Sequence, residues 1–399
     1  MKILVLNCGS SSVKYKLIDT ATTDVMAEGG VEKIGLPDGF LKFRQADGSK
    51  AIKELGKTDH HGAIEAILSI LTDPVLGCIK DFAEINAVGH RVVHGGEKFN
   101  QSVIITDAVK QKIRDCYDIA PLHNPANMTG IEAMETLLPG VPQVAVFDTA
   151  FHQTMPPKAY MYALPYRFYT EDGVRRYGFH GTSHRYVSQR VCEILGVDIK
   201  TQKIVTCHIG NGGSITAVDG GRSIDTSMGL TPTEGLMMGT RVGDIDPGAL
   251  TFLMTRHNMT PAQLQTVINK ESGMLGVSEL SSDMREIEAA VGNGNERAQL
   301  ALDMYENRIT KYIGAYAAEM GGLDIIVFTG GVGENQTDVR DNVCAPLKFM
   351  GVEIDKAVND TVRGTETVIS TDSSRVKVVV VPTDEELMIA RDTEQLVNC

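Results

Sequence analysis

The segment KILVLNCGSSSVKYKLID, at residues 2–19, has the same pattern as the segment KIVTCHIGNGGSITAVDG, at residues 203–220. Each begins with a short apolar strand, continues through a polar turn rich in Gly and Ser, and ends in a second alternating strand with an acidic residue. Because each segment opens about half of the chain, the pair predicts a duplicated domain with a cleft between the copies. Two unrelated β-hairpins would give the same local pattern.

The rest of the chain alternates apolar runs with amphipathic windows, which is typical of an α/β protein. Asn124 followed by Pro125 predicts the N-cap and the first residue of a helix. Further strands are predicted at 87–93, 143–148, 324–329 and 376–381, and helices at 62–71, 107–119, 125–138, 184–195, 296–320 and 385–397.

Composition excludes several classes of protein. Of the 399 residues, 38 are Lys or Arg and 51 are Asp or Glu, and the resulting net charge of −13 argues against a nucleic-acid or anionic-membrane partner. The seven Cys are scattered and odd in number, which is typical of reduced thiols in a cytosolic protein. The apolar run at residues 3–6 is too short for a signal peptide, and no stretch is long enough to span a membrane. We therefore predict a soluble, cytoplasmic protein.

Gly-rich turns indicate where phosphate groups bind. The chain has 40 Gly, about a tenth of its residues against a typical value of about 7%. Three clusters follow predicted strands: NCGSSS at 7–12 with Lys14 close behind, HIGNGG at 208–213, and TGGVGEN at 329–335. Successive backbone N–H groups in such turns form anion-binding concavities. Any one of them is explained as a tight connection, but three together favour a nucleotide site.

The common nucleotide motifs are absent. A Walker A loop ending in Gly56-Lys57-Thr58 would need Gly where Ala51 stands. No G-x-G-x-x-G follows a predicted strand, and His90-Arg91 continues with Val92 where a protein kinase needs Asp. The chain is therefore neither a P-loop enzyme, a dinucleotide-binding protein nor a protein kinase.

Charged residues at strand ends and in Gly-rich loops are candidates for binding phosphate, carboxylate or metal ions. Arg91, in GHRVVHGG, and Arg241, in GTRVGD, carry planar forks that match phosphate or carboxylate oxygens, although most arginines only solubilise a surface. Asp148 ends the strand at 143–148, where ligands gather in α/β sheets or where a helix N-cap would stand. Glu385 follows the strand at 376–381 and either complements a helix dipole or holds Mg²⁺.

His180 and His184 are four residues apart and could share one helix face as metal ligands. No third ligand and no H-E-x-x-H glutamate accompany them, which disfavours zinc. A contact between one of these two histidines and a phosphoryl group is the favoured interpretation.

Seven motifs in order resemble the acetate kinase (acetokinase) family: NCGSSSVK, GHRVVHGG, FDTAFH, YGFHGTSH, HIGNGGS, MGTRVGDIDPG and FTGGVGEN. The resemblance extends from residue 3 to about residue 391. It implies duplicated actin-like ATPase (ribonuclease H-like) domains with nucleotide in the interdomain cleft. The acetate side would be residues 1–150, joined by the C-terminal helix at 385–399, and the nucleotide-binding domain residues 151–384.

The resemblance implies a homodimeric enzyme of acetyl-CoA biosynthesis. It would transfer the γ-phosphoryl group of ATP reversibly to acetate with Mg²⁺ or Mn²⁺, giving acetyl phosphate and ADP. A propionate or other short-chain carboxylate kinase is the first alternative. A sugar kinase would need polar residues for hydroxyl groups in the acceptor pocket, and an actin-like or chaperone-type ATPase would hydrolyse ATP slowly and independently of acetate.

Site residues follow from the positions that match the family's motifs. Asn7 and Glu385 match the magnesium positions, Arg91 the acetate-binding arginine, His180 and Arg241 the pair that stabilises the transferring phosphoryl group, and Asp148 the residue usually given as proton donor or acceptor. The acetate methyl pocket would comprise Val93, Leu122, Phe179 and Pro232. ATP would be bound by Ser12, Lys14, His208, Ile209, Gly210, Asn211, Gly212, Asp283, Met284, Arg285, Gly331, Val332, Gly333, Glu334 and Asn335.

Two points depart from the family's usual description. Asp384 stands where the family commonly has Asn, and the extra negative charge would affect the metal site or Glu385. Acetate is already ionised at pH 7, so direct in-line attack by its carboxylate needs no base. We therefore expect Asp148 to orient Arg91 or a magnesium-bound water.

Overall fold

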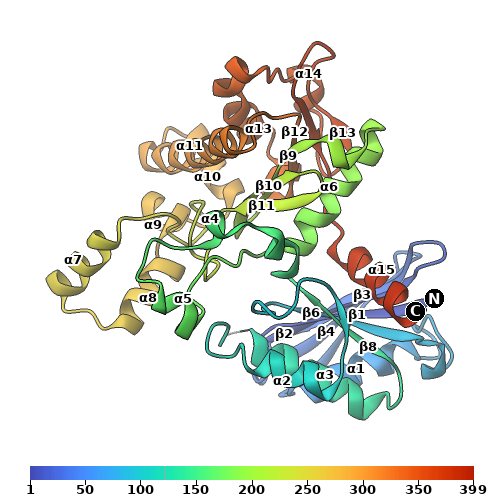
Figure 1. Ribbon diagram of the computed structural model, residues 1–399. Helices are drawn as coiled ribbons and strands as arrows, with labels where there is room; N and C mark the ends of the chain where they lie inside the picture. The colour runs from blue at the N-terminus through green and yellow to red at the C-terminus, as the bar shows by residue number, and fades with distance from the viewer. Residues whose placement is uncertain (122) are drawn as a thin grey trace. The chain divides into compact units, whose positions relative to one another are not determined.

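The computed structural model describes residues 1–121 and 123–399, and the chain divides into two compact units. Unit 1 comprises Met1–Gln153 and Asp384–Cys399, and unit 2 comprises Thr154–Thr383. The chain thus leaves unit 1 once and returns to it for the last helix, drawn in red in Figure 1.

Unit 1 contains an eight-stranded sheet in the order β5-β4-β3-β2-β1-β6-β8-β7. The first five strands pair antiparallel in sequence order, β6 and β8 continue the sheet parallel to β1, and β7 pairs antiparallel to β8. The strands are β1 (Lys2–Cys8), β2 (Ser12–Asp19), β3 (Asp24–Glu32), β4 (Gly39–Gln45), β5 (Lys50–Gly56), β6 (Ala87–Val92), β7 (Val103–Ile104) and β8 (Gln143–Phe147).

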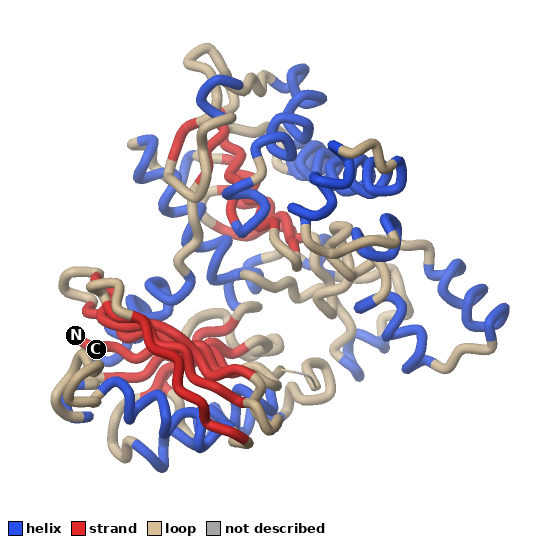
Figure 2. The backbone as a smooth tube through the Cα atoms, turned by 180° about the vertical axis from the view of Figure 1, so that it is seen from behind, coloured by secondary structure: helices blue, strands red, loops and turns tan. Residues whose placement is uncertain are grey.

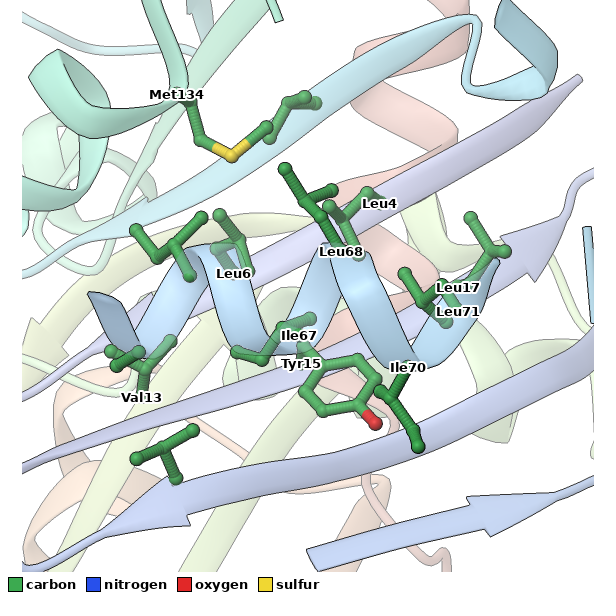
Figure 3. Packing of buried hydrophobic residues seen from close by; sticks show 14 of the residues in the cluster. Leu4, Leu6, Val13, Tyr15, Leu17, Ile67, Leu68, Ile70, Leu71 and Met134 are labelled. Carbon is green, nitrogen blue, oxygen red and sulfur yellow. The ribbon is translucent and has the colours of Figure 1, made fainter. Parts of the chain in front are cut away.

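Helices cover both faces of this sheet, which is why β1 is apolar at nearly every position. Leu4 and Leu6 face α1 (His60–Leu71) and α3 (Asn124–Leu137), where they join the hydrophobic cluster drawn in Figure 3. Ile3 and Val5 point the other way, as alternate strand residues must, and pack in a cluster with Ile389 of α15 (Glu385–Val397). Helix α2 (Asp107–Arg114) lies beside α3, opposite α15 (Figure 1).

Unit 2 repeats the topology of unit 1. Its six-stranded sheet has the order β11-β10-β9-β12-β14-β13, with antiparallel and parallel pairs in the same places as in β3-β2-β1-β6-β8-β7. Figure 2 shows the two sheets as separate groups of red strands. The duplication predicted from the two Gly-rich segments is therefore confirmed. The strands are β9 (Lys203–Ile209), β10 (Gly213–Asp219), β11 (Arg222–Thr226), β12 (Ile325–Thr329), β13 (Thr367–Val368) and β14 (Lys377–Val380).

Unit 2 is the more helical of the two. Its longest helix, α11 (Glu296–Glu319), packs along α9 (Gly273–Ser278) and α10 (Met284–Gly292) and reaches the sheet at β9 and β10. None of the described helices is both long and apolar enough to cross a lipid bilayer. The other helices of unit 2 are α4 (Pro157–Tyr160), α5 (Arg167–Asp172), α6 (Gly181–Leu195), α7 (Pro247–His257), α8 (Pro261–Lys270), α12 (Gly330–Asn335), α13 (Thr337–Cys344), α14 (Lys356–Asn359), and the short 3-10 helices η3 (Ile199–Thr201) and η4 (Ala345–Met350). Unit 1 also contains the 3-10 helix η1 (Phe82–Glu84), and η2 (Ala150–Thr154) lies at the boundary of the two units.

Three local expectations were wrong. Asn124 does not cap α3: it is the first helical residue, and its buried amide accepts from the His94 N–H and donates to the His94 carbonyl. The helix predicted at 107–119 ends at Arg114, because Cys116 and Tyr117 turn back with N–H bonds to carbonyls three residues earlier. Residues 330–335 form α12 after strand β12, not a turn between strands.

Candidate active site

Arg91 and Asp148 form a bidentate ion pair in unit 1. Strands β6 and β8 are parallel neighbours, with Val92 paired to Phe147, so the residues at their carboxyl ends lie side by side. Arg91 Nε donates to Asp148 Oδ1 at 3.0 Å, and Nη2 donates to Oδ2 at 2.6 Å. Asp148 is 2% exposed, so the guanidinium is held by a buried carboxylate and only part of its surface remains available.

The same end of the sheet holds the predicted magnesium residues. Asn7 on β1 is paired with Lys14 on β2, and both line a small cavity of about 10 Å³ together with Arg91 and Glu385. Burial raises the pKa of Glu385 to about 7 against the opposing effect of Arg91. Burial also opposes the charge of Arg91, but Asp148 and Glu385 outweigh it and raise the pKa of Arg91 above its usual value.

The donors around this cavity fit a hard divalent cation. Asn7 offers an amide oxygen and Glu385 a carboxylate whose pKa is raised chiefly by burial. Within residues 1–121 and 123–399, no group of three or more His, Cys, Asp and Glu residues is arranged to hold a metal. Mg²⁺ is commonly held by one or two carboxylates while phosphate groups and water complete its shell, so Glu385 supplies the carboxylate and Asn7 a further oxygen.

Asp384 caps the N-terminus of α15. Its Oδ1 accepts from the Leu387 N–H at 3.0 Å as the N-cap of α15, and Lys16 lies 3.7 Å away. Asn could accept the same backbone bond but would lose the attraction to Lys16.

In unit 2, His180 stands immediately before α6 in the left-handed region, with φ of 53°. This conformation is uncommon for a residue with a side chain and marks functional sites. The His180 ring is stacked on His208, at the end of β9, with centroids 4.2 Å apart. His180 Nδ1 lies 2.9 Å from the hydroxyl oxygen of Ser214 on β10.

Arg241 lies next to this pair of histidines. A Cβ placed on Gly212 would lie 3.2 Å from Arg241 Nη1 and 4.0 Å from His180 Cε1, so Gly212 keeps open the space between the two side chains. Arg241 Nη1 donates to the Pro232 carbonyl at 3.2 Å. Burial lowers the pKa of Arg241, and no carboxylate in the described part of the chain offsets this effect. A desolvated cation of this kind favours an anionic ligand.

A cavity of about 640 Å³ in unit 2 is large enough for a nucleotide. It is lined by most of the predicted ATP-binding residues: Gly210, Asn211, Asp283, Met284, Arg285, Gly331, Val332 and Asn335.

Other predicted ATP-binding residues are placed differently. Glu334 Oε1 accepts from the N–H groups of Gly330 and Thr383, so its carboxylate holds the backbone of these two segments. Ile209 is fully buried in β9, and Ser12 begins β2, where its carbonyl accepts from the Gly9 N–H. Gly333, His208 and Gly212 likewise do not line the cavity.

The predicted methyl pocket stays a prediction. Val93 is buried in unit 1, and its N–H donates to Asn127 Oδ1 at 3.1 Å. Phe179 is buried in unit 2, to which Pro232 also belongs. Leu122 lies outside the described residues.

Two supporting residues were missed by sequence reasoning. Asn127 on α3 holds Val93 through its oxygen, and its Nδ2 donates to the Cys8 carbonyl at 2.7 Å, so it ties the first Gly-rich turn to the segment after Arg91. Ser214 contacts His180 and also His184, at 2.7 Å. A polar residue on the buried face of α3 was a usable signal for Asn127, whereas nothing in HIGNGGS distinguishes the role of Ser214.

The shared strand order of the two units defines a duplicated α/β protein of the kind expected for a ribonuclease H-like kinase. The sequence matches the acetokinase family over residues 2–391, and the chain belongs to that family. This confirms the predicted class of enzyme, a kinase.

Relatives of known name cover the whole chain. Acetate kinase of Parabacteroides distasonis is 63% identical over the full length of both sequences. The crystal structure of Porphyromonas gingivalis acetate kinase is 60% identical, with a TM-score of 0.97 and 99% of each chain covered. A propionate kinase structure from Francisella tularensis is 41% identical, with a TM-score of 0.92 and 99% of each chain covered.

Proposed function

We propose that the chain is an acetate kinase, which transfers the γ-phosphoryl group of ATP reversibly to acetate and produces acetyl phosphate and ADP. The observation that carries the proposal is the full-length similarity, at 60% identity and a TM-score of 0.97, to a solved acetate kinase. The ion pair in unit 1 and the nucleotide-sized cavity in unit 2 supply the binding groups that this reaction needs.

Unit 2 binds the nucleotide. The backbone of the Gly-rich segments can approach phosphates closely, and the cavity lined by Asp283–Arg285 and Gly331 has the volume for the nucleoside. Arg241 and His180 donate to the non-bridging oxygens of the transferring phosphoryl group, where negative charge must be balanced.

Unit 1 binds the acceptor. Asp148 occupies the Nε and Nη2 edge of the Arg91 guanidinium with both of its oxygens, which leaves the Nη1 side for the carboxylate of the acceptor. One acetate oxygen attacks the γ-phosphorus in line, a new P–O bond forms, and the bond to the bridging oxygen breaks with its electron pair remaining on ADP. Acetate enters as the anion, so Asp148 removes no proton and acts as the positioning residue for Arg91.

Asn7 and Glu385 would hold Mg²⁺, or Mn²⁺ in its place. The cation supplies neutralisation of phosphate oxygens, which lowers their repulsion for an anionic acceptor. Without it, burial favours a proton on Glu385 near pH 7.

The cysteines and the family resemblance bear on the cellular setting and the assembly of the enzyme. The free thiols, of which Cys8, Cys116, Cys192, Cys207 and Cys344 are buried, suit a reducing cytoplasm. The family resemblance supports a homodimer, which light scattering of the purified protein tests directly. Acetyl phosphate is an activated acyl donor, which suits a role in acetyl-CoA biosynthesis.

A chain-length series tests the proposed function. The purified protein is incubated with MgATP and acetate, propionate, butyrate or a hexose, and acyl phosphate is trapped as the hydroxamate. We expect the highest kcat/KM with acetate and no sugar phosphorylation. A preference for propionate would assign the first alternative, and slow ATP hydrolysis unaffected by acetate would assign an actin-like or chaperone-type ATPase.

A further inference from the structure

A buried chain of hydrogen bonds in unit 2 connects His180 to the interior of the sheet. His180 Nδ1 lies 2.9 Å from Ser214 Oγ, and the same oxygen lies 2.7 Å from His184 Nε2. His184 Nδ1 in turn lies 2.7 Å from Thr206 Oγ1, which donates to the Thr216 carbonyl oxygen at 3.4 Å. Ser214, His184 and Thr206 are fully buried, so their polar atoms depend on one another.

Ser214 determines which ring nitrogens carry protons. Its hydroxyl has one proton, so it donates to one of the two facing nitrogens and accepts from the other. Thr206 also has one hydroxyl proton, and its bond to the Thr216 carbonyl uses that proton. Thr206 therefore accepts from His184 Nδ1–H, His184 Nε2 accepts from Ser214, and Ser214 accepts from His180 Nδ1–H.

This direction fixes the form in which His180 can help the reaction. With its proton on Nδ1, a neutral His180 has only a lone pair at Nε2, on the far side of the ring. Donation from Nε2 to a phosphoryl oxygen then requires the doubly protonated imidazolium. A hydrogen bond accepted by Ser214 favours that charged form.

We propose that Ser214 is a positioning residue for phosphoryl transfer: it holds the His180 ring and stabilises the imidazolium whose Nε2–H donates to the transferring phosphoryl group. The inference rests on the proposed function, because it specifies how His180 acts in that reaction. Ser214 needs no contact with a substrate, and Thr206 acts on His180 only through His184 and Ser214.

The titratable and charged groups that face His180 in the described contacts are His184, His208 and Arg241. The ring centroids of His208 and His184 lie 4.2 Å and 6.5 Å from that of His180, and Arg241 lies on the other side of Gly212. A nearby guanidinium disfavours a second positive charge. The bond to Ser214 counteracts this effect.

Three variants test the chain of bonds. Ser214→Ala removes the acceptor and should lower kcat about 10- to 100-fold, the worth of a hydrogen bond to a charged group, with the KM for ATP changed less than twofold. The alkaline limb of its kcat–pH profile should move to lower pH. Thr206 contacts no proposed substrate group. Thr206→Val should nevertheless lower kcat and move the alkaline limb of the kcat–pH profile to lower pH, as Ser214→Ala does. Thr216→Val is the matched control: Thr216 lies on the same strand as Ser214, and the variant removes a buried hydroxyl bonded to Thr226 of β11 while it leaves the Thr216 carbonyl in place.

Nitrogen NMR of the histidine rings supplies a readout that does not need activity. We expect a protonated Nδ1 on both His180 and His184 in the wild type, and a lower pKa of His180 in Ser214→Ala and Thr206→Val but not in Thr216→Val. A His184 proton on Nε2, or wild-type kcat and pH profile in Ser214→Ala, would overturn the inference. Loss of kcat in Thr216→Val equal to that in Ser214→Ala would overturn it too, since the effect would be structural. A wild type that makes no acyl phosphate overturns the proposed function instead, while the NMR result still decides the proton positions.

Discussion

Arg91 and Arg241 show how the same side chain is prepared for different tasks. Arg91 has one edge of its guanidinium, Nε and Nη2, fixed by the two oxygens of Asp148, so its position is set before any ligand arrives. Arg241 donates to a carbonyl oxygen, and no carboxylate among the residues the structure describes offsets the desolvation of its charge. The fixed position of Arg91 suits binding of an anionic substrate in the ground state. The unbalanced charge of Arg241 suits stabilisation of the negative charge on the phosphoryl group as it binds and reacts.

We expect Arg241→Ala to lower kcat about 10³-fold or more, by analogy with arginine fingers that stabilise phosphoryl transfer. The measurement is steady-state kinetics in both directions. Arg285→Ala is the comparison, because Arg285 is 81% exposed at the cavity lining and should change the KM for ATP more than kcat. A loss of less than tenfold in Arg241→Ala would remove Arg241 from the transition state.

Asp148→Asn keeps the shape of the side chain but removes its charge and one of its two acceptors. Because Arg91 then loses part of its support, we expect kcat/KM for acetate to fall about 10- to 100-fold, the worth of a charge-assisted hydrogen bond. The kcat–pH profile should keep its shape. Activity that returns at high pH in the manner of a titrating base would contradict the positioning role.

The predicted pocket for the acetate methyl group is tested by Val93→Ala. Removing methyl groups from Val93 should make room for one further methylene and shift the propionate-to-acetate ratio of kcat/KM towards propionate by about 1 kcal/mol, or roughly fivefold. The two acyl phosphates are measured in parallel with one enzyme preparation. An unchanged ratio would show that Val93 does not border the methyl group.

At the scale of elements, the close approach of α15 to the sheet is made possible by Gly89 on β6. A Cβ at Gly89 would lie 2.6 Å from Ile389 Cγ2 and 2.7 Å from Thr393 Oγ1 of α15. Gly89→Ala should therefore lower the free energy of unfolding by about 1–3 kcal/mol, as overpacking does. Urea unfolding measures the change, and Gly292→Ala on α10, which meets no neighbouring atom, is the control. Equal stability of the two variants would contradict this packing.

The pairing of β6 with β8 makes stability depend on pH. His90 Nε2 lies 2.6 Å from Gln143 Oε1, and burial lowers the pKa of His90 from 6.5 to about 4. Between these values the unfolded state binds more protons, so the contribution of neutral His90, about 3 kcal/mol, is complete above pH 6.5 and is lost as pH falls through 4.

His90→Asn removes this titration. We expect the variant to be less stable than the wild type at pH 7.5, with a smaller difference at pH 5, when the midpoints of urea unfolding are compared. A difference that is the same at both pH values would exclude His90 as the titrating group.

Elements with buried apolar runs were predicted well, and strands without such runs were not. Strands β1, β8 and β12 are apolar at nearly all positions because both faces of the sheet are covered. The sequence gives no such signal for β3, which contains Gly29 and Gly30, or for β5, whose residues are mostly exposed. These strands form because neighbouring strands already present free N–H and C=O groups, which a local pattern does not reveal.

At the site too, some residues could be predicted from the sequence and others could not. Arg91 and Asp148 could be selected from the sequence because they follow strands, where α/β proteins bind ligands. The bond between them depends on β6 and β8 being neighbours, and the roles of Ser214 and Asn127 depend on residues more than 30 positions away in the chain. A motif identifies which residues react, whereas the side chains that hold them are visible only in the folded unit.

For the whole molecule, duplication explains the distribution of glycine and charge. The Gly-rich turns after β1 and β9 occupy the same place in two copies of one topology. The net charge of −13 repels anionic substrates, so binding must come from locally placed cations such as Arg91 and Arg241. High salt should therefore weaken substrate binding less than it would in an enzyme that relies on a positively charged surface.

The return of α15 to unit 1 has a consequence for biosynthesis. All strands of the unit 1 sheet are translated before residue 150, but the helix that covers Ile3, Val5 and Val146 is translated last. At about 5–20 residues per second, the ribosome needs roughly 10 to 50 s to proceed from Gln153 to Val397. During that interval one apolar face of the nascent unit 1 sheet has no helix packed on it. Unit 1 is therefore synthesised first but can complete its fold only after unit 2 has been synthesised.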